Sequence, residues 1–421
     1  MKKIFKQITA LSALFVFVSS GICPVKAQTG VNSPYSRYGI GTLSDQSTGI
    51  TRSMGGIGAG FRHPNTLNLK NAASYSDIDT LTFVADLGFT LQNGNFSEND
   101  VKVNARNAYI SHMAMQFRIL PKVGMTVGFV PFSNVGYNYS NQELVRRDED
   151  GEITATNSYA GTGGIRQFMA GLGWRTTEWL SLGMNASYLS GDITHSVINT
   201  YSSTDIQSRV KTYNAEMGAL KLDFGAQGTI RFGKNESLVL GATFTPSQRL
   251  ESDTYVTDAH STSDSTVIAD AFSFPDLISA GFTYKWKNHM VGADVSYETW
   301  SKATFFGQKT GRDRLSASAG FMYRPDEMSR SLFKRTSYQV GMNFSQPYFN
   351  VENSKGPMQF GVSAGLSMPL TSSYNSMSYL HISGEYVRVQ PLVKGMITEN
   401  YIRINLGVTF MERWFMKLMV D

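Results

Sequence analysis

Cysteine is almost absent from this 421-residue sequence, in which Cys23 is the only one. It lies in a segment with the pattern of a secretory signal peptide, because lysines near the start precede an apolar run at 8–18. Ala27 is a small residue at a suitable cleavage position, so we expect a signal peptide at 1–27 and a mature chain that begins at Gln28. Cleavage removes Cys23, and the mature protein then has neither a disulfide nor thiol chemistry.

Net charge is also nearly absent. The signal peptide carries four lysines and no acidic residue, so its removal lowers the formal net charge from +5 to +1. A nearly neutral chain gives no reason to expect a nucleic-acid partner. The six histidines are dispersed without metal-ligand spacing, and serines are too frequent for any Ser–His pair to be informative. We therefore expect no metal, no cofactor and no catalytic residues, and a protein that is not an enzyme.

Long apolar runs are missing as well, because none after residue 27 reaches the length of a membrane-spanning helix. Instead, apolar and polar residues alternate with a period of two, which is typical of β-strands with two different faces. Near the C-terminus, for example, Ile402, Ile404 and Leu406 alternate with Arg403 and Asn405. In a bilayer, every backbone N–H and C=O of an exported chain with this pattern needs a hydrogen-bond partner within the protein. A closed transmembrane antiparallel β-barrel is the structure that provides these partners. We expect the barrel to lie in outer-membrane lipid.

The alternation predicts fourteen strands, an even number as in single-chain bacterial barrels. Every second connection is short, whereas 141–159 and 249–271 are predicted to be long polar loops, as on the outer side of such barrels. Four tryptophans lie near the short turns and Trp300 near a long loop, as interfacial girdles predict. A soluble β-sandwich or barrel is the alternative fold. The strands are expected near 79–93, 104–120, 122–140, 160–176, 178–200, 205–232, 234–248, 272–286, 288–304, 311–325, 333–348, 355–370, 374–389 and 396–412.

Residues 28–71 do not follow the strand pattern. They are rich in Gly, Ser and Asn and precede the first predicted strand. This segment is therefore either a flexible periplasmic tail or a hatch, a plug folded into the barrel lumen. We place the barrel at 72–415 and a short periplasmic tail at 416–421.

Two short motifs stand before the first strand, Arg52-Ser53-Met54-Gly55-Gly56 and Asn71-Ala72-Ala73-Ser74-Tyr75. Together with the ending at 407–415, they resemble the FadL family of transporters for hydrophobic compounds, in a form similar to FadL-like proteins of Bacteroidota-type bacteria. The resemblance implies fourteen strands, a hatch inside the barrel and a wall defect that releases ligands sideways. The family's Asn-Pro-Ala signature reads Asn-Ala-Ala here, so that turn lacks the rigidity of proline. The hatch residues implied are Arg52, Met54, Gly55, Gly56, Asn71, Ala72 and Ala73.

The third predicted strand carries a proline in its interior. Pro131 has no amide proton, so a ladder hydrogen bond must be missing there. In a bilayer, such a gap has to face protein or a water-filled cavity. Either this position is the lateral opening, or Pro131 lies at the end of the strand and merely begins the outer loop. The candidate residues of the opening are Gly128, Phe129, Pro131, Phe132 and Gly136.

Charged residues on the polar faces of the strands are expected to point into the lumen. One interpretation makes them a path for a ligand or ion. The other is a pairing network that braces the hatch against the wall, because charges enclosed by protein need partners. The principal candidates are Asp86, Arg118, Asp223, Arg231, Asp294, Glu298 and Arg403.

The resemblance to FadL implies passive uptake of small hydrophobic compounds such as fatty acids, with lateral release through the wall. The alternative is a barrel subunit of an outer-membrane protein-secretion or assembly complex, with other envelope proteins as partners. A general porin is disfavoured by the plug-like segment.

Overall fold

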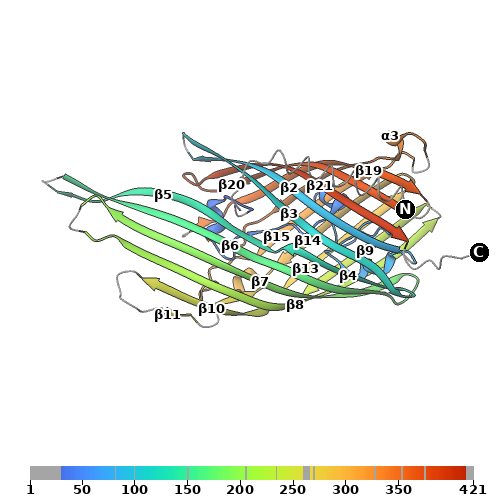
Figure 1. The fold of residues 1–421 in the computed structure, drawn as a ribbon, viewed down its shortest axis with the longest axis horizontal. Coiled ribbons are helices and arrows are strands. Elements are labelled where there is room, and N and C mark those ends of the chain that lie inside the picture. Colours follow the sequence, from blue (N-terminus) through green and yellow to red (C-terminus); the bar gives the residue numbers. More distant parts are fainter. Residues whose placement is uncertain are drawn as a thin grey trace, which may run out of the picture.

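The computed structural model describes residues 30–413 except 81, 99, 149–150, 204–205, 234, 259–265, 269–270, 327–328, 352–353 and 374–375. The predicted signal peptide with Cys23, the predicted tail at 416–421 and Trp414 lie outside the described residues. Figure 1 shows one elongated barrel whose strands run along its length and extend beyond the body at one end.

In the described part of the chain, the wall is a closed antiparallel barrel of 14 strands. Neighbours in sequence are neighbours in the sheet, and the last strand pairs with the first along its length, which leaves no open seam between them. Three of the wall strands are each interrupted once and therefore carry two labels, namely β4 with β5, β9 with β10, and β12 with β13. The wall consists of β2 (Thr82–Glu98), β3 (Val101–Leu120), β4 (Val123–Pro131), β5 (Ser133–Asp148), β6 (Gly151–Arg175), β7 (Leu180–Tyr201), β8 (Arg209–Gly233), β9 (Glu236–Thr245), β10 (Gln248–Asp258), β12 (Phe272–Phe274), β13 (Leu277–Trp286), β14 (His289–Glu298), β15 (Arg314–Tyr323), β16 (Ser337–Ser345), β19 (Met358–Ser373), β20 (Ser376–Gln390) and β21 (Thr398–Arg413).

The other elements are short. The helices are η1 (Pro34–Arg37), α2 (Gly49–Ser53), η2 (Ala72–Asp77), η3 (Trp300–Lys302) and α3 (Leu332–Arg335), and the minor strands are β1 (Thr42–Leu43), β11 (Thr266–Val267), β17 (Asn350–Val351) and β18 (Ser354–Lys355). Among the described residues, no helix has the length and apolar character needed to cross a membrane.

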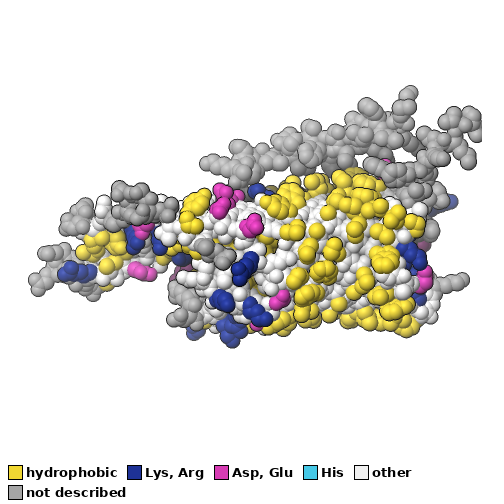
Figure 2. Space-filling view, turned by 90° about the horizontal axis from the view of Figure 1, so that it is seen from below, with side chains coloured by type: hydrophobic (Ala, Val, Ile, Leu, Met, Phe, Trp, Pro, Cys, Tyr) yellow, Lys and Arg dark blue, Asp and Glu magenta, His cyan; other side chains and the backbone are white. Residues whose placement is uncertain are grey.

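The period-two alternation decides which side chains face outward. In β21, Ile402, Ile404 and Leu406 are exposed on the outside, whereas Asn405 and Thr409 are buried inside. The same arrangement around the ring leaves large apolar side chains exposed over the barrel body (Figure 2). Charged side chains gather where the projecting strands leave the body (Figure 2), as expected at a membrane boundary. This apolar band identifies the body as the membrane-spanning part.

The predicted long loops at 141–159 and 249–271 are wrong for most of their length. β5 and β6 stay paired up to Asp148 and Gly151, and β10 continues to pair with β8 as far as Asp258. These strands form the projection at the end of the barrel in Figure 1. Their sequences looked like loops because both faces lie in water and carry Asn, Ser and Thr, while cross-strand hydrogen bonds still satisfy the backbone.

The interfacial role predicted for Trp300 is also wrong. Its side chain is 2% exposed, stacks on Phe305, lies at a tilt against the ring of Tyr348, and donates its indole N–H to the Glu298 carboxylate at 2.5 Å. It therefore belongs to a buried cluster under the outer connections. Trp174 and Trp179 are 55% and 61% exposed beside the β6–β7 turn, as a girdle requires.

Residues 30–78, hereafter the N-terminal segment, lie inside the barrel. Figure 1 shows this blue segment enclosed by the wall. Ile50, Met54, Ile57 and Phe61 are buried against Met290 and Met322 of the wall. The first wall strand begins at Thr82, and Ala72–Asp77 forms the helix η2, so the segment continues beyond the expected boundary near residue 72.

Candidate functional site

The N-terminal segment lies against the wall backbone to backbone. Gly55 adopts φ +72° and Gly56 φ +82°, which side chains with a Cβ rarely tolerate. A Cβ on wall residue Gly341 would collide with Gly55, and one on Gly183 would collide with the backbone of Ala72 and Ala73. Glycines in the wall therefore form the groove that holds α2 and η2.

Wall side chains provide hydrogen-bond partners for backbone groups of the N-terminal segment. Asp294 accepts a hydrogen bond from the Ala59 amide at 2.8 Å, and Thr283 donates to the Gly60 carbonyl at 2.7 Å. Asn71 donates to the Ala59 carbonyl at 2.7 Å and accepts from the Ala73 amide, as a cap of η2. An irregular segment can lie inside a barrel only with such partners. Asn71 therefore caps η2, and Ala72 stands where the Asn-Pro-Ala signature has proline.

Charges within the segment are paired as well. The Arg52 guanidinium donates to Thr90 of β2 at 3.2 Å and to the Ser47 carbonyl at 3.1 Å. Lys70 contacts the Asp45 carboxylate at 2.8 Å. Burial alone would raise the pKa of Asp45, but Lys70 and Arg52 lower it well below its usual range. Asp45 is therefore ionised and fixed in the lumen.

Above this layer lies a cavity of about 320 Å³, hereafter the lumen pocket. Four cations line it, and each pairs with a carboxylate: Lys70 with Asp45, Lys221 with Asp223, Arg314 with Glu298 at 2.8 Å, and Arg403 with Glu385 at 3.5 Å. The remaining lining combines the aromatic rings of Phe132, Phe274, Phe344 and Trp300 with many hydroxyl and amide side chains, such as Thr245 and Gln359.

The seven predicted lumen residues do not form one site. Asp223, Asp294, Glu298 and Arg403 line the lumen pocket together. Asp86 is buried elsewhere, 3.3 Å from the His112 imidazole, and Arg118 donates to Thr80 at the short-turn end. Arg231 lies in a separate cavity at that end. Among the described residues, no three His, Cys, Asp or Glu side chains are grouped in a way that could hold a metal ion.

The wall ladder is incomplete beside Pro131. β3 pairs with β4 only from Met113 to Leu120, and above Met113 its outer half pairs with β2 alone. β5 pairs with β6 over its length, while its other edge pairs only with β1, at Ser133 and Asn134. A gap therefore separates the outer half of β3 from β5, hereafter the β3–β5 gap. Phe129 pairs with Met113 just below the gap, so all five candidate residues from Gly128 to Gly136 lie along its lower margin or on β5.

The local sequence explains why the strand breaks. Phe132 donates its amide to the Ile165 carbonyl of β6, so the preceding nitrogen, that of Pro131, faces β3 and has no proton to donate. On β6, Gly163 and Gly164 adopt φ +119° and +142°, and β5 turns inward so that Val135 is fully buried. Two adjacent glycines within a predicted strand are a recognisable signal for a bend, which apolar–polar alternation alone does not report.

The N-terminal segment covers the gap from inside. Asn32 donates to Asn107 of β3 at 3.2 Å, while Ser36 accepts from the Gly136 amide of β5 at 3.0 Å. Ser33 donates to Glu399 of β21 at 2.6 Å. Residues 30–37 therefore bridge the two edges through side-chain hydrogen bonds rather than through a strand ladder.

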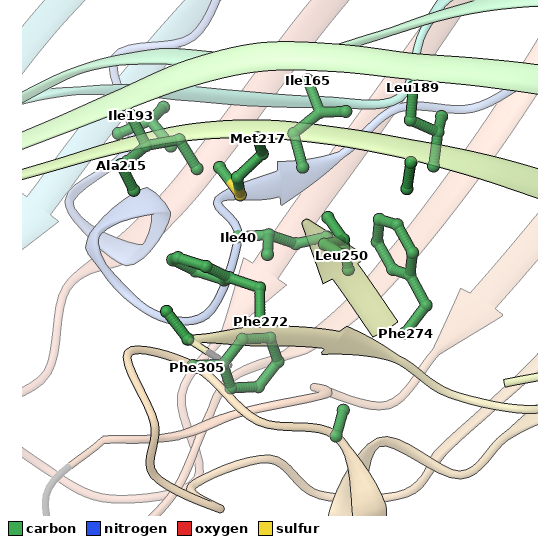
Figure 3. Close-up of a cluster of buried hydrophobic side chains, with 14 of the residues drawn as sticks. Ile40, Ile165, Leu189, Ile193, Ala215, Met217, Leu250, Phe272, Phe274 and Phe305 are labelled. Atoms are coloured by element: carbon green, nitrogen blue, oxygen red, sulfur yellow. The ribbon is translucent and has the colours of Figure 1, made fainter. Parts of the chain in front are cut away.

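An apolar cluster connects the lumen pocket to this gap. Figure 3 shows Ile40 at its centre, between Ile165 and Leu189 on one side and Phe272 on the other. Phe132 packs against the cluster, with its ring 5.1 Å from that of Phe274, and both rings also line the lumen pocket. Packed hydrocarbon side chains therefore fill the space between the lumen pocket and β5 at the gap.

Comparison with solved structures confirms the fold. The chain is similar to the toluene transporter TodX of P. putida (TM-score 0.56, 13% identity, 89% of this chain and 100% of TodX covered). It is also similar to the toluene transporter TbuX of Ralstonia pickettii (TM-score 0.55, 12% identity, 88% of this chain and 99% of TbuX covered). A Pseudomonas aeruginosa FadL homologue is similar as well (TM-score 0.54, 10% identity, 89% of this chain and 100% of the homologue covered). The FadL-like barrel of fourteen strands expected from the sequence is thus confirmed. With the apolar band, this fold locates the protein in the outer membrane.

Sequence comparison assigns the family. No curated protein matches the chain. A family profile described as BamG matches residues 4–421, which includes the whole barrel and the N-terminal segment. This match spans nearly the full sequence, and the chain therefore belongs to the BamG family.

Proposed function

We propose that the barrel takes up small hydrophobic compounds from outside and releases them sideways through the β3–β5 gap. The observation that carries the proposal is the interrupted ladder beside Pro131, at the outer margin of the exposed apolar band. Inside a bilayer, unpaired strand edges are tolerated only where protein or a cavity faces them. Here residues 30–37 cover the edges, and a packed apolar cluster lies between them and the lumen pocket, so that a ligand passes by displacing hydrocarbon side chains.

In this proposal the N-terminal segment acts as a hatch. Its part at 49–78 stays fixed by backbone contacts with wall glycines, whereas residues 30–37 shift to open the gap. The bridging contacts are a few side-chain hydrogen bonds, each of which contributes only about 1 kcal/mol net. A shift of this short stretch therefore costs far less than unfolding the wall.

The lumen pocket favours uncharged ligands over fatty-acid anions. All four of its cations are already paired with carboxylates, so a ligand carboxylate would have to displace an acidic side chain. A neutral aromatic compound needs no such exchange and fits the rings of Phe132, Phe274 and Trp300. Two of the similar structures are those of toluene transporters, which is consistent with this class of ligand.

Pro131→Val tests this function. Valine restores the missing donor toward β3 and favours a continuous ladder, so uptake of radiolabelled toluene by cells should fall several-fold at unchanged barrel abundance. Pro369→Val, in a part of β19 that already pairs with β20, is the matched control and should leave uptake unchanged.

A second candidate function is a structural one, as a barrel subunit of a protein-secretion or assembly complex. The projecting strands favour it, because Leu144, Val145 and Ile198 are exposed there, away from the apolar band. In that case, deletion disturbs other envelope proteins, and partners copurify stoichiometrically. If toluene uptake is the same with wild type, Pro131→Val and deletion, the transport proposal is wrong and this candidate takes its place.

A further inference from the structure

A second cavity lies at the short-turn end of the barrel, below the N-terminal segment. Its volume is about 280 Å³. Its lining comes from the N-terminal segment, the β6–β7 turn, the short-turn ends of β8, β9, β13 and β14, and the residue after β15. It carries five cations: Arg62, Arg175, Arg231, Lys285 and Arg324. We call this cavity the basic pocket.

Acidic residues compensate only part of this charge. Asp77 lies 3.1 Å from Arg62 and 2.8 Å from Arg175, so one carboxylate serves two guanidinium groups. Glu178, the other acidic residue of the lining, pairs with Lys122 at 3.7 Å, outside the cavity.

Two cations of the lining are available for a ligand. Arg231 and Lys285 form no ion pair with any residue that the structure describes, and both side chains are exposed to the cavity mouth. Arg324 donates its Nε proton to Ser337 at 2.7 Å, which fixes the guanidinium beside them. The arrangement therefore presents excess positive charge around a water-accessible volume.

The positive charges of the basic pocket affect the pKa of His63, which faces the same cavity. Burial, together with the positive charges of Arg324 and Lys285, lowers its pKa to about 3. The imidazole is therefore neutral at physiological pH and adds a hydrogen-bonding group without adding charge. Hydroxyls of Ser181, Thr229 and Ser237 complete the polar lining.

We propose that the basic pocket binds a phosphate group at the periplasmic mouth of the barrel. Arginine presents paired donors that match phosphate oxygens, and lysine adds a point charge, so this lining suits a dianion better than a neutral ligand. The phosphate can come from a free anion or from a phospholipid headgroup of the inner leaflet. This binding is independent of the β3–β5 gap, which lies at the opposite end of the barrel.

The test uses the full-length mature barrel in detergent, titrated with pyrophosphate by calorimetry at low ionic strength. Saturable binding in the micromolar to millimolar range is expected, weakened at least about tenfold by Arg231→Gln combined with Lys285→Gln, because charge-assisted contacts are lost. Lys334→Gln is the matched control, since Lys334 is exposed on α3 at the same end and does not line the pocket. It should bind as the wild type does.

A parallel titration with dihexanoyl phosphatidic acid below its micelle concentration separates the two sources. Tighter binding than pyrophosphate assigns the pocket to a lipid headgroup, and equal or weaker binding assigns it to a free anion. The proposal is overturned if neither probe gives saturable binding, or if the double variant binds both as well as wild type. Heat-modifiable gel migration shows that each variant is folded.

Discussion

The two ends of the N-terminal segment are held in different ways. At 49–78, wall glycines such as Gly183 and Gly341 let backbone pack on backbone, and the surrounding ladder is continuous. At 30–37, the segment spans the β3–β5 gap and contacts its edges through side chains such as Asn32 and Ser36. Backbone packing between fixed strands permits no small adjustment, whereas side-chain hydrogen bonds exchange readily with water. In our proposal, residues 49–78 therefore act as a rigid plug and residues 30–37 as a displaceable cover.

The largest expected effect comes from breaking the wall on which both ends depend. Leu406 faces lipid in the middle of β21, and arginine there costs about 2–4 kcal/mol near the bilayer midplane. Leu406→Arg should strongly reduce the heat-modifiable barrel in outer-membrane fractions. The control is Gln359→Arg, which points into the lumen pocket and should assemble normally. Equal assembly of both variants would contradict the assigned facing.

The neighbouring lumen residue Asn405 is a poor control, despite its inward facing. It is 5% exposed and accepts hydrogen bonds from Thr90 at 2.8 Å and Arg52 at 3.4 Å. An arginine at this position would bring a second guanidinium beside Arg52 without an acidic partner. Alternation predicts which way a side chain points, but it does not show whether the lumen is filled there.

A smaller effect is expected from displacing the rigid end. Gly183→Val introduces a Cβ that collides with the backbone of η2, and such overpacking typically costs about 1–3 kcal/mol. The variant should unfold at lower denaturant concentration and expose residues 49–78 to protease. Gly384→Val is the matched control, because no atom lies within 4 Å of a Cβ added at Gly384. If the two variants are equally stable, the segment is not held by glycine contacts.

The smallest effect on stability should come from loosening the cover. Ser36→Ala removes the acceptor of the Gly136 amide, at a cost of about 1 kcal/mol. Hydrogen exchange at 30–43 should become faster, while unfolding of the barrel changes little. Ser53→Ala serves as the control at the rigid end, since the Ser53 hydroxyl has no hydrogen-bond partner among the described residues. If hydrogen exchange in the Ser36→Ala variant is faster at 49–78 than at 30–43, residues 30–37 are not the more loosely held end of the segment.

Much of this architecture could be predicted from the sequence, because alternation along strands reports facing directly. Strand number, barrel closure and the irregular strand at Pro131 follow from periodicity and from the missing amide of proline. The projecting strands could not be predicted, because polar strands in water have the composition of loops. The burial of Trp300 and the bend at Gly163 depend on contacts with distant residues, which alternation within one strand does not report.

The central claim is that hydrophobic compounds leave the barrel through the β3–β5 gap. A reversible disulfide that locks the N-terminal segment at residue 30 to β3 tests this claim most directly. A Cβ added at Gly30 would lie 3.5 Å from the Cβ of Tyr109 on β3, within the range of roughly 3.5–4.5 Å found in disulfides. In Gly30→Cys combined with Tyr109→Cys, oxidation should abolish uptake of radiolabelled toluene, and a reductant should restore it. The control pair replaces Thr194 and Asn214, which lie opposite each other on β7 and β8, and its uptake should be the same in both states. Equal uptake by the oxidised and reduced forms of the first pair would contradict release through the β3–β5 gap.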